Sequence, residues 1–472
     1  MSAAGKAIRW AVRLALLAAA VLLALGGPLP ALLTKAVPGL KPAAIVRAVP
    51  GLSPLAAAAS AVSQRRWYLA AAWAAAALVV LGVAVWKGRL FCRWVCPAGT
   101  LYSLPARLSL KRPLLKVRLG PLVFWTVVFG SLAGAPLVLF LDPLATFHRL
   151  TPLLRGTWTA ASVVAGVLLP LMLLIGFIQP MLWCTHLCPL GYFFELARSL
   201  RKRPLHTFSS TRRSIVGGLL VGAPLAALAR HLPAARRLLL AGEKPPLPVL
   251  PPGAADPATF AAACTRCYAC VNVCPARIIR VPMPLGRALG QLFQPEIEYY
   301  QNDDEPDWGY CPEWCNECSG VCPTGALAAL SFDQKHQRQI GLAEVVKKAC
   351  LAWEDKQDCS VCQEVCPYQA VELRLDEQSG VACPVVMEDL CRGCGACQSK
   401  CPAIRMGKAI VVRGVAEQID VRCRGRRKQR GGASGKGTGG GKGMGKGLGK
   451  GLGKGRGGRG AAPRGAMRHA KC

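Results

Sequence analysis

Sixteen of the 23 cysteines fall into four groups between residues 264 and 401. In each group the last cysteine stands directly before a proline. The groups are Cys264, Cys267, Cys270 and Cys274; Cys311, Cys315, Cys318 and Cys322; Cys350, Cys359, Cys362 and Cys366; and Cys391, Cys394, Cys397 and Cys401. These groups constrain the fold strongly, because four thiols at a recurring spacing must either share a ligand or bond to one another.

The first and fourth groups have the C-x2-C-x2-C-x3-C-P spacing of bacterial ferredoxins, and the other two widen only the first gap. Three such thiolates can wrap one 4Fe–4S cluster, while the cysteine before the proline is aimed at a neighbouring cluster. Cys274 and Cys322 can thus be exchanged between groups, as can Cys366 and Cys401. Disulfides and structural zinc are the alternatives, but neither favours this Pro-terminated recurrence. We therefore predict four 4Fe–4S clusters.

The formal net charge of +34 is unevenly distributed. Residues 1–240 hold 27 Lys and Arg against two acids, residues 241–423 hold 17 against 23, and residues 424–472 hold 15 against none. The cysteine-rich part is therefore mildly acidic, so the overall charge gives no reason to expect nucleic-acid binding. Glycine motifs that cradle nucleotide phosphates are absent from the sequence, and we expect neither nicotinamide nor flavin to bind this chain directly.

Residues 1–240 contain four long apolar runs, at 10–33, 67–86, 121–141 and 158–183. As a helix, each is long enough to cross a hydrocarbon core of about 30 Å. The four runs predict four transmembrane helices. Basic residues gather between the second and third runs and after the fourth, which places the N-terminus, residues 87–119 and residues 184–213 in the cytoplasm. A cleaved signal peptide is an alternative for the first run only. The segment 34–66 repeats Ala-Val-Pro-Gly-Leu and is predicted to form turns at the membrane surface.

A second cysteine motif, C-x3-C-P-x-G, follows the second and the fourth apolar run. One copy supplies Cys92 and Cys96, and the other supplies Cys184 and Cys188. If the helix persists through each copy, its two thiols share one helix face. Two such pairs make a complete metal-ligand set for one further 4Fe–4S cluster between helices. A redox-active or merely structural thiol pair is the alternative.

The stretch from Ser210 to Ala229 joins twin arginines, Arg212 and Arg213, to a short and weakly apolar run. It resembles an internal twin-arginine export signal, and a cytoplasmic linker facing anionic lipid is the alternative. After it come a stiff Pro-rich linker and, at the end of the chain, a Gly/Lys-rich tail that should be disordered.

These features predict the domain organisation. We expect a membrane domain at 1–205, a signal or anchor segment at 206–232, a linker at 233–257, a cluster domain at 258–423 and a disordered tail at 424–472. The predicted fold class is an α-helical membrane domain with four to five transmembrane helices, joined to a small α+β ferredoxin-like domain with four 4Fe–4S clusters.

With its two C-x3-C-P motifs, the membrane part resembles NapH-type subunits of quinol dehydrogenases, a group related to NosR and to methylamine-utilisation membrane proteins. The twin-arginine segment and the four cysteine groups resemble NapG-type exported ferredoxin subunits. The resemblance implies a multi-pass protein of the bacterial inner membrane with a periplasmic ferredoxin domain. Electrons would pass from the quinol pool to a periplasmic oxidoreductase or a cytochrome c-type acceptor. In four-cluster relatives the groups pair one with four and two with three, which implies that Cys274 joins the fourth cluster.

Quinol is apolar, so membrane helices must supply its site, and two protons must leave with the two electrons. Asp142, the only acid in the first 190 residues, and His148 are the candidate catalytic residues for proton handling. The alternative is an Asp-Pro helix start with a surface histidine. A single electron hop across the hydrocarbon layer, from a cytoplasmic C-x3-C-P centre to a periplasmic ferredoxin domain, is not expected. A cytoplasmic-facing redox protein and an accessory factor for metallocentre assembly remain alternative functions.

Overall fold

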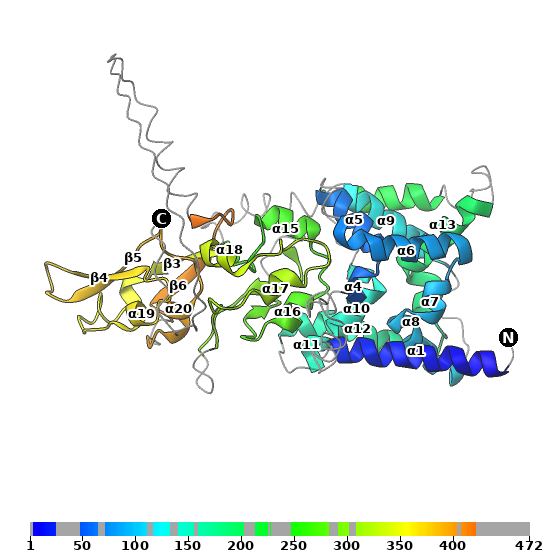
Figure 1. Cartoon of the computed structure of the whole chain (residues 1–472), viewed down its shortest axis with the longest axis horizontal. Coiled ribbons are helices and arrows are strands. Elements are labelled where there is room, and N and C mark those ends of the chain that lie inside the picture. Colours follow the sequence, from blue (N-terminus) through cyan, green and yellow to red (C-terminus); the bar gives the residue numbers. More distant parts are fainter. Residues whose placement is uncertain are drawn as a thin grey trace, which may run out of the picture.

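A computed structural model describes residues 3–24, 48–64, 71–110, 117–132, 140–154, 159–202, 213–224, 227, 247–282, 291–301, 308–403 and 407–421. The N-terminal helices occupy one end of the molecule, and the small strands occupy the other (Figure 1). We refer to the described residues up to 227 as the helical part and to those from 247 onward as the ferredoxin part.

The helical part contains helices of very different lengths. They are α1 (Ala3–Ala24), α4 (Ala48–Gly51), α5 (Pro54–Gln64), α6 (Ala71–Lys87), α7 (Leu90–Trp94), α8 (Pro97–Ser103), η2 (Pro105–Arg107), α9 (Gly120–Leu132), α10 (Pro143–Arg149), α11 (Thr151–Leu154), α12 (Ala160–Gly176), the π-helix η4 (Trp183–Leu187) and α13 (Pro189–Lys202). Their shared core includes the cysteines of both C-x3-C-P motifs, packed among Phe91, Phe124 and Phe194. The second cysteine motif therefore lies inside this part.

Helices form within all four apolar runs, but their lengths differ from the predicted spans. α1 has 22 residues and includes Lys6, Arg9 and Arg13, while α6 and α12 have 17 residues each. In the portion of the chain that the structure describes, none of the helices is both long enough and apolar enough to cross a membrane. The four predicted membrane spans are therefore not confirmed.

The prediction of surface turns in 34–66 is wrong for the second half of that segment. Residues 54–64 form α5, which starts with a proline at its first position and continues through a run of alanines with high helix propensity. α5 packs against α6 and α9, and Leu55 and Ala56 are buried. The first copy of the repeat, at 36–40, lies outside the described residues.

Residues 213–224 of the predicted export signal form a helix that packs against α9. A Cβ added at Gly218 would lie 2.4 Å from the Cβ of Trp125, and one added at Gly222 would lie 3.1 Å from the carbonyl oxygen of Thr126. Glycine therefore permits this close helix–helix approach. Arg212 lies outside the described residues, and the export function stays a prediction.

The ferredoxin part is built from short elements. Its helices are α15 (Pro257–Ala263), α16 (Ala269–Val273), α17 (Glu317–Gly320), α18 (Phe332–Gln337), η7 (Lys347–Ala349), α19 (Val361–Glu364) and α20 (Ala396–Lys400), and its strands are β1 (Ile279–Arg280), β2 (Glu296–Ile297), β3 (Gly341–Val345), β4 (Val371–Leu375), β5 (Ala382–Val386) and β6 (Ile410–Gly414). The strands form three antiparallel pairs, β1–β2, β3–β6 and β4–β5. Cysteines make up a large share of its core, which is consistent with a small ferredoxin-type domain.

The predicted linker 233–257 is wrong from residue 247 onward, because this stretch belongs to the ferredoxin part. Val249 and Leu250 are buried, and the carbonyl oxygen of Val249 accepts a hydrogen bond from the Ile297 N–H. The Gln418 side chain donates to the carbonyl oxygens of Leu250 and Pro251 at 3.0 and 3.1 Å. These contacts fix the segment to the domain that it was predicted only to connect.

The helical and ferredoxin parts contact each other directly. Ser60 Oγ in α5 donates to the carbonyl oxygen of Ala263 at 3.0 Å, and Thr159 Oγ1 donates to that of Val281 at 2.8 Å. The Phe140 ring also packs on Phe293. Figure 1 shows α15 close to α5, and α16 next to α11. The first cysteine group therefore lies at the boundary between the two parts.

Candidate metal centres

The sixteen cysteines of the ferredoxin part gather into four sets of four. Each set takes three cysteines from one group and the fourth from another. Site A contains Cys264, Cys267, Cys270 and Cys322; site B contains Cys311, Cys315, Cys318 and Cys274; site C contains Cys350, Cys359, Cys362 and Cys401; and site D contains Cys391, Cys394, Cys397 and Cys366. Groups one and two thus exchange their last cysteines, as do groups three and four.

This exchange corrects the pairing of groups one with four and two with three that the resemblance implied. α16 of the first group packs on α17 of the second, and α19 of the third packs on α20 of the fourth. Groups that follow each other along the chain are therefore neighbours in space, as consecutive elements usually are. Cys274 accordingly joins site B instead of the fourth group.

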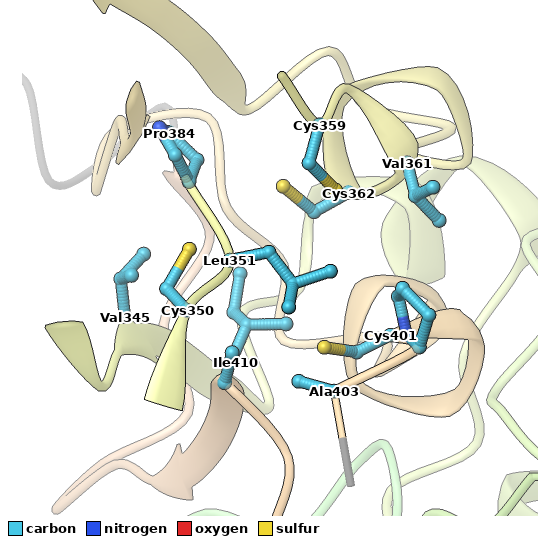
Figure 2. Close-up of a pocket in the computed structure, with 12 residues that line it drawn as sticks. Val345, Cys350, Leu351, Cys359, Val361, Cys362, Pro384, Cys401, Ala403 and Ile410 are labelled. Atoms are coloured by element: carbon cyan, nitrogen blue, oxygen red, sulfur yellow. The ribbon is translucent and has the colours of Figure 1, made fainter. Parts of the chain in front are cut away.

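The cysteines of sites B, C and D each line a small cavity. Figure 2 shows the four cysteines of site C around one cavity, with Val345, Ala403 and Ile410 among its apolar walls. At site A, burial raises the pKa of the Cys267 thiol to about 12, and Cys322 and Cys264 add to that effect. At sites B, C and D, cysteines from separate segments line a common cavity, and at site A they are close enough for their charges to interact.

The chemistry of these sets fits a 4Fe–4S cluster. Four buried thiols whose negative charges oppose one another need a compensating positive charge before they can ionise, and iron supplies it. With a cluster bound, each cysteine would hold one of its iron atoms. Among the described residues, no three or more His, Cys, Asp or Glu side chains are arranged to hold a single metal ion. The described cysteines are all free thiols in this structure.

The helix does not persist through the C-x3-C-P motifs, which corrects one expectation about their geometry. α7 ends at Trp94, and Cys96 caps the N-terminus of α8, with its sulfur accepting from the Gly99 N–H at 3.4 Å. In the second motif Cys188 follows η4, and its sulfur accepts from the Gly191 N–H at 3.3 Å. The two motifs therefore have the same local structure.

The four thiols of these motifs come together at what we call site E: Cys92, Cys96, Cys184 and Cys188. Burial raises the pKa of the Cys92 thiol well above its usual value, and Cys96, Cys188 and Cys184 raise it further. The Arg89 side chain donates to the carbonyl oxygen of Cys184 at 3.2 Å, so a cation lies beside the thiols. Like sites A to D, site E is a set of four facing sulfurs.

The sites follow one another in a row. The Cys311 N–H of site B donates to the carbonyl oxygen of Cys394 in site D at 2.9 Å. Cys270 in site A is close enough to Cys318 in site B for the two charges to interact. The same holds for Cys397 in site D and Cys362 in site C. The order from the helical part outward is therefore A, B, D and C, which agrees with the positions of α16, α17, α20 and α19 in Figure 1.

Asp142 caps the N-terminus of α10 and is buried. Its Oδ1 accepts from the N–H groups of Leu144 and Ala145 at 3.0 and 3.2 Å, and its Oδ2 accepts from Ser53 Oγ at 2.6 Å. Burial raises the pKa of the carboxyl group above its ordinary value. The alternative of an Asp-Pro helix start is thus correct as a description of the structure.

His148 is buried, so the alternative of a surface histidine is wrong. Only 1% of the residue is exposed, and neither ring nitrogen has a hydrogen-bond partner among the described residues. Burial lowers the pKa of the imidazole to about 4, so the ring is neutral at pH 7. A neutral, buried and unpartnered imidazole is able to bind a hydroxyl group or accept a proton.

Sequence reasoning missed two buried arginines that contact the sites. Arg13 in α1 donates through Nη2 to the carbonyl oxygen of Gly99 at 2.9 Å and to Ser103 Oγ at 2.6 Å, beside site E. Arg149 in α10 donates to the carbonyl oxygens of Arg266 and Thr265, beside site A. The sequence offered only their charge, which entered the topology prediction. α1 packs against α8.

Comparisons with known proteins agree with this chemistry. A family model described as a 4Fe-4S binding domain matches residues 69–116 and 159–207, which include both C-x3-C-P motifs. No solved structure matches the chain.

Three ferredoxin-type relatives match parts of the chain. The ferredoxin-type protein NapF of Escherichia coli K12 is 32% identical over 171 residues, which cover 36% of this chain and 90% of NapF. The methylamine utilization ferredoxin-type protein MauM of Methylophilus methylotrophus is 34% identical, over 32% of this chain and 65% of MauM. The ferredoxin-type protein NapG of Escherichia coli K12 is 32% identical, over 33% of this chain and 68% of NapG. The finer resemblance of the helical part to NapH-type subunits is not shown by these matches. The chain therefore belongs to the family of ferredoxin-type proteins that includes NapF, and it is an iron–sulfur electron-transfer protein that binds 4Fe–4S clusters.

Proposed function

We propose that this chain oxidises quinol in its helical part and passes the electrons through sites E, A, B, D and C to a periplasmic oxidoreductase. The observation that best supports the proposal is the position of α10. The helix starts at Asp142, whose carboxylate is close enough to affect Cys96 and Cys188 of site E. It ends at Arg149, which donates hydrogen bonds into the loop of site A. One short helix thus links the two sites.

In this proposal each site holds one 4Fe–4S cluster, bound by the four cysteines that define the site. Bound clusters supply one-electron transfer. The residues of the chain keep the sites close together, in a largely apolar core, and in a fixed order. Backbone N–H groups also donate to ligand sulfurs, as in the hydrogen bond from Ala370 to Cys366 Sγ at 3.2 Å. Such hydrogen bonds favour the negatively charged thiolates.

The short length of α10 supports a short path for electrons between site E and site A. A helix of seven residues is about 10 Å long, whereas the hydrocarbon core of a bilayer is about 30 Å thick. A centre at the C-x3-C-P motifs therefore need not lie on the far side of a membrane from site A. We propose that the helical part is embedded in the inner membrane and that the ferredoxin part lies on its periplasmic side.

We propose His148 as the group that receives a proton from quinol. Oxidation of one quinol to quinone releases two electrons and two protons. A neutral imidazole accepts one of these protons at a ring nitrogen, the other proton is released to water, and the electrons would pass one at a time to a cluster at site E. The Asp142 carboxylate already accepts three hydrogen bonds. Its proposed role is mainly to hold α10 in place, and less to contact quinol directly. His148 is thus the first residue to test.

The test compares His148→Phe with the unaltered chain, both purified anaerobically in detergent. A short-chain quinol analogue should reduce the clusters of the unaltered chain, as seen by EPR. The variant should lose at least about tenfold in this rate, typical of a proton-transfer group. Reduction by dithionite should be unchanged, because it bypasses quinol.

Two further variants serve as comparisons. His336→Phe replaces a histidine of the ferredoxin part and should behave like the unaltered chain. Asp142→Asn keeps the size of the side chain, and unchanged quinol oxidation there would leave Asp142 with a structural role alone. A quinol rate unaffected by His148→Phe would refute the proposed role of His148.

A topology reporter separates this function from a cytoplasmic-facing redox protein. The reporter belongs at the C-terminus, because Gly253 is buried within the ferredoxin part and a fusion there would divide the domain. A periplasmic signal supports the proposal, and a cytoplasmic signal contradicts it. An assembly factor for metallocentres would show no reduction by the quinol analogue.

A further inference from the structure

Arg149 crosses from the helical part into the loop that carries site A. Its side chain is fully buried. Nε donates to the carbonyl oxygen of Arg266 at 2.8 Å, Nη2 donates to that of Thr265 at 3.2 Å, and Nη1 donates to that of Phe140. Residues 265 and 266 lie between Cys264 and Cys267, so the guanidinium group is bound to the backbone that shapes site A.

The loop of site A also contains an arginine of its own, Arg266, which is held in an unfavourable backbone conformation. Arg266 and Tyr268 have φ values of 56° and 60°. In the fourth group, which has the same cysteine spacing, the equivalent positions are Gly393 and Gly395, with φ values of 71° and 83°. Glycine adopts this left-handed region freely, whereas other residues are disfavoured there. In the loop of site A, an arginine therefore has a left-handed backbone conformation that glycine would adopt without strain.

The Arg266 side chain stays at site A through its own hydrogen bonds. Its Nη1 donates to the carbonyl oxygen of Cys264 at 2.9 Å, and its Nε donates to that of Leu292 at 2.8 Å. Both guanidinium groups are thus buried within the same small region. Two buried positive charges repel each other and lose their hydration, and this cost is offset only when negative charge lies nearby.

Site A itself supplies that negative charge. A 4Fe–4S cluster with four thiolates is a net anion, and it gains one more negative charge on reduction. Burial lowers the pKa of both Arg149 and Arg266. Tyr268, Asp142 and Cys267 oppose this effect at Arg149, and Cys264 opposes it at Arg266. The Asp142 carboxylate also acts on Arg149, but its oxygens already accept three hydrogen bonds from Ser53, Leu144 and Ala145.

We propose that Arg149 raises the reduction potential of the cluster at site A, and that it does so only while the helical and ferredoxin parts are docked. Reduction adds one electron and forms or breaks no bond, so a fixed positive charge beside the site favours the reduced state. Arg149 is therefore a positioning residue that couples the interface to the potential of the first ferredoxin site. The inference rests on the proposed ligands of site A and is independent of quinol oxidation.

The experiment is an EPR-monitored redox titration of the full chain. Arg149→Gln keeps hydrogen-bond donors but removes the charge, and Arg149→Lys keeps the charge but loses the planar fork. Cys267→Ala identifies the signal of site A by its loss. Arg413→Gln is the matched control, because Arg413 is half-exposed and pairs with Glu344 away from site A.

We expect Arg149→Gln to weaken reduction of site A by about tenfold, which is a fall of about 59 mV in the potential of a one-electron couple. Arg149→Lys should retain most of the potential, while Arg413→Gln and the other sites should not change. Equal shifts in the Gln and Lys variants, or no shift in either, would overturn the proposal. Retention of every cluster signal in Cys267→Ala would overturn the ligand assignment and this inference with it, whatever the result for quinol.

Discussion

At the scale of single residues, a cysteine that precedes a proline has the same backbone conformation at several places in the chain. Cys96, Cys188, Cys274 and Cys401 all have φ between −59° and −67° and ψ between 111° and 122°. A following proline disfavours the helical region for the residue before it, so the cysteine is extended and the chain turns after it. The sulfurs of Cys96 and Cys188 also accept a hydrogen bond from the first turn of the helix that follows, from the N–H groups of Gly99 and Gly191.

His148 gives a prediction about pH. Its pKa is about 4 in the folded protein and about 6.5 when unfolded, so only the unfolded chain binds this proton between these values. Stability is therefore lost as pH falls from 6.5 toward 4, by about 2 kcal/mol between pH 7 and pH 5. His148→Phe should remove this contribution, and urea unfolding of both proteins at the two pH values measures it. An identical pH dependence in the variant would show that His148 is not buried as a neutral ring.

At the scale of elements, the cysteine spacing predicted which thiols act together, but not which group supplies the fourth. Spacing fixes how three cysteines wrap one site, whereas the last cysteine depends on which helices pack together. The convergence of the two C-x3-C-P pairs was predictable because they repeat. The contact of Arg149 with Arg266 was not, since 117 residues separate them and no local pattern records such a contact. The helix α5 was missed because a Pro-Gly repeat outweighed the alanines that follow it.

The packing of α1 on α8 gives a prediction about Arg13. Its side chain donates to the carbonyl oxygen of Gly99, to Ser103 Oγ and to Thr100 Oγ1, and it is buried. Hydrogen bonds from charged groups contribute about 1.5–3 kcal/mol each, and their loss leaves buried acceptors unsatisfied. Arg13→Ala should therefore destabilise the helical part by about 3 kcal/mol, as measured by chemical unfolding.

Arg198→Ala is the control for Arg13, because Arg198 is exposed on α13. It should change the stability by less than about 0.5 kcal/mol. Mass spectrometry of the mature chain provides the complementary test. A mature chain that lacks residues 3–24 would contradict a structural role for α1.

At the scale of the whole molecule, five sets of four cysteines lie in one continuous body, with site E inside the helices and site C farthest from them. Sites A, B, D and C are connected by contacts between the segments that carry them, and α10 connects site E to site A. The helical part is at one end of this row, and site C is at the other. The half-exposed Cys359 and Cys362 are at that far end.

Iron content tests how many of these sites are loaded. At four iron atoms per cluster, the anaerobically purified chain should contain about 20 iron atoms. A double variant, Cys96→Ser with Cys188→Ser, removes two ligands of site E and should lower the content by about four. An unchanged iron content would mean that the C-x3-C-P cysteines hold no cluster.

The order of the sites is the central claim, and removal of one in the middle tests it most directly. In Cys318→Ala, site B loses a ligand, and a quinol analogue mixed with the full chain is followed by freeze-quench EPR. We predict that site A is reduced as in the unaltered chain while sites D and C stay oxidised. Cys383→Ala, which removes a buried cysteine outside the five sites, should leave all of them reducible. Reduction of site C at the unaltered rate in Cys318→Ala would contradict the account.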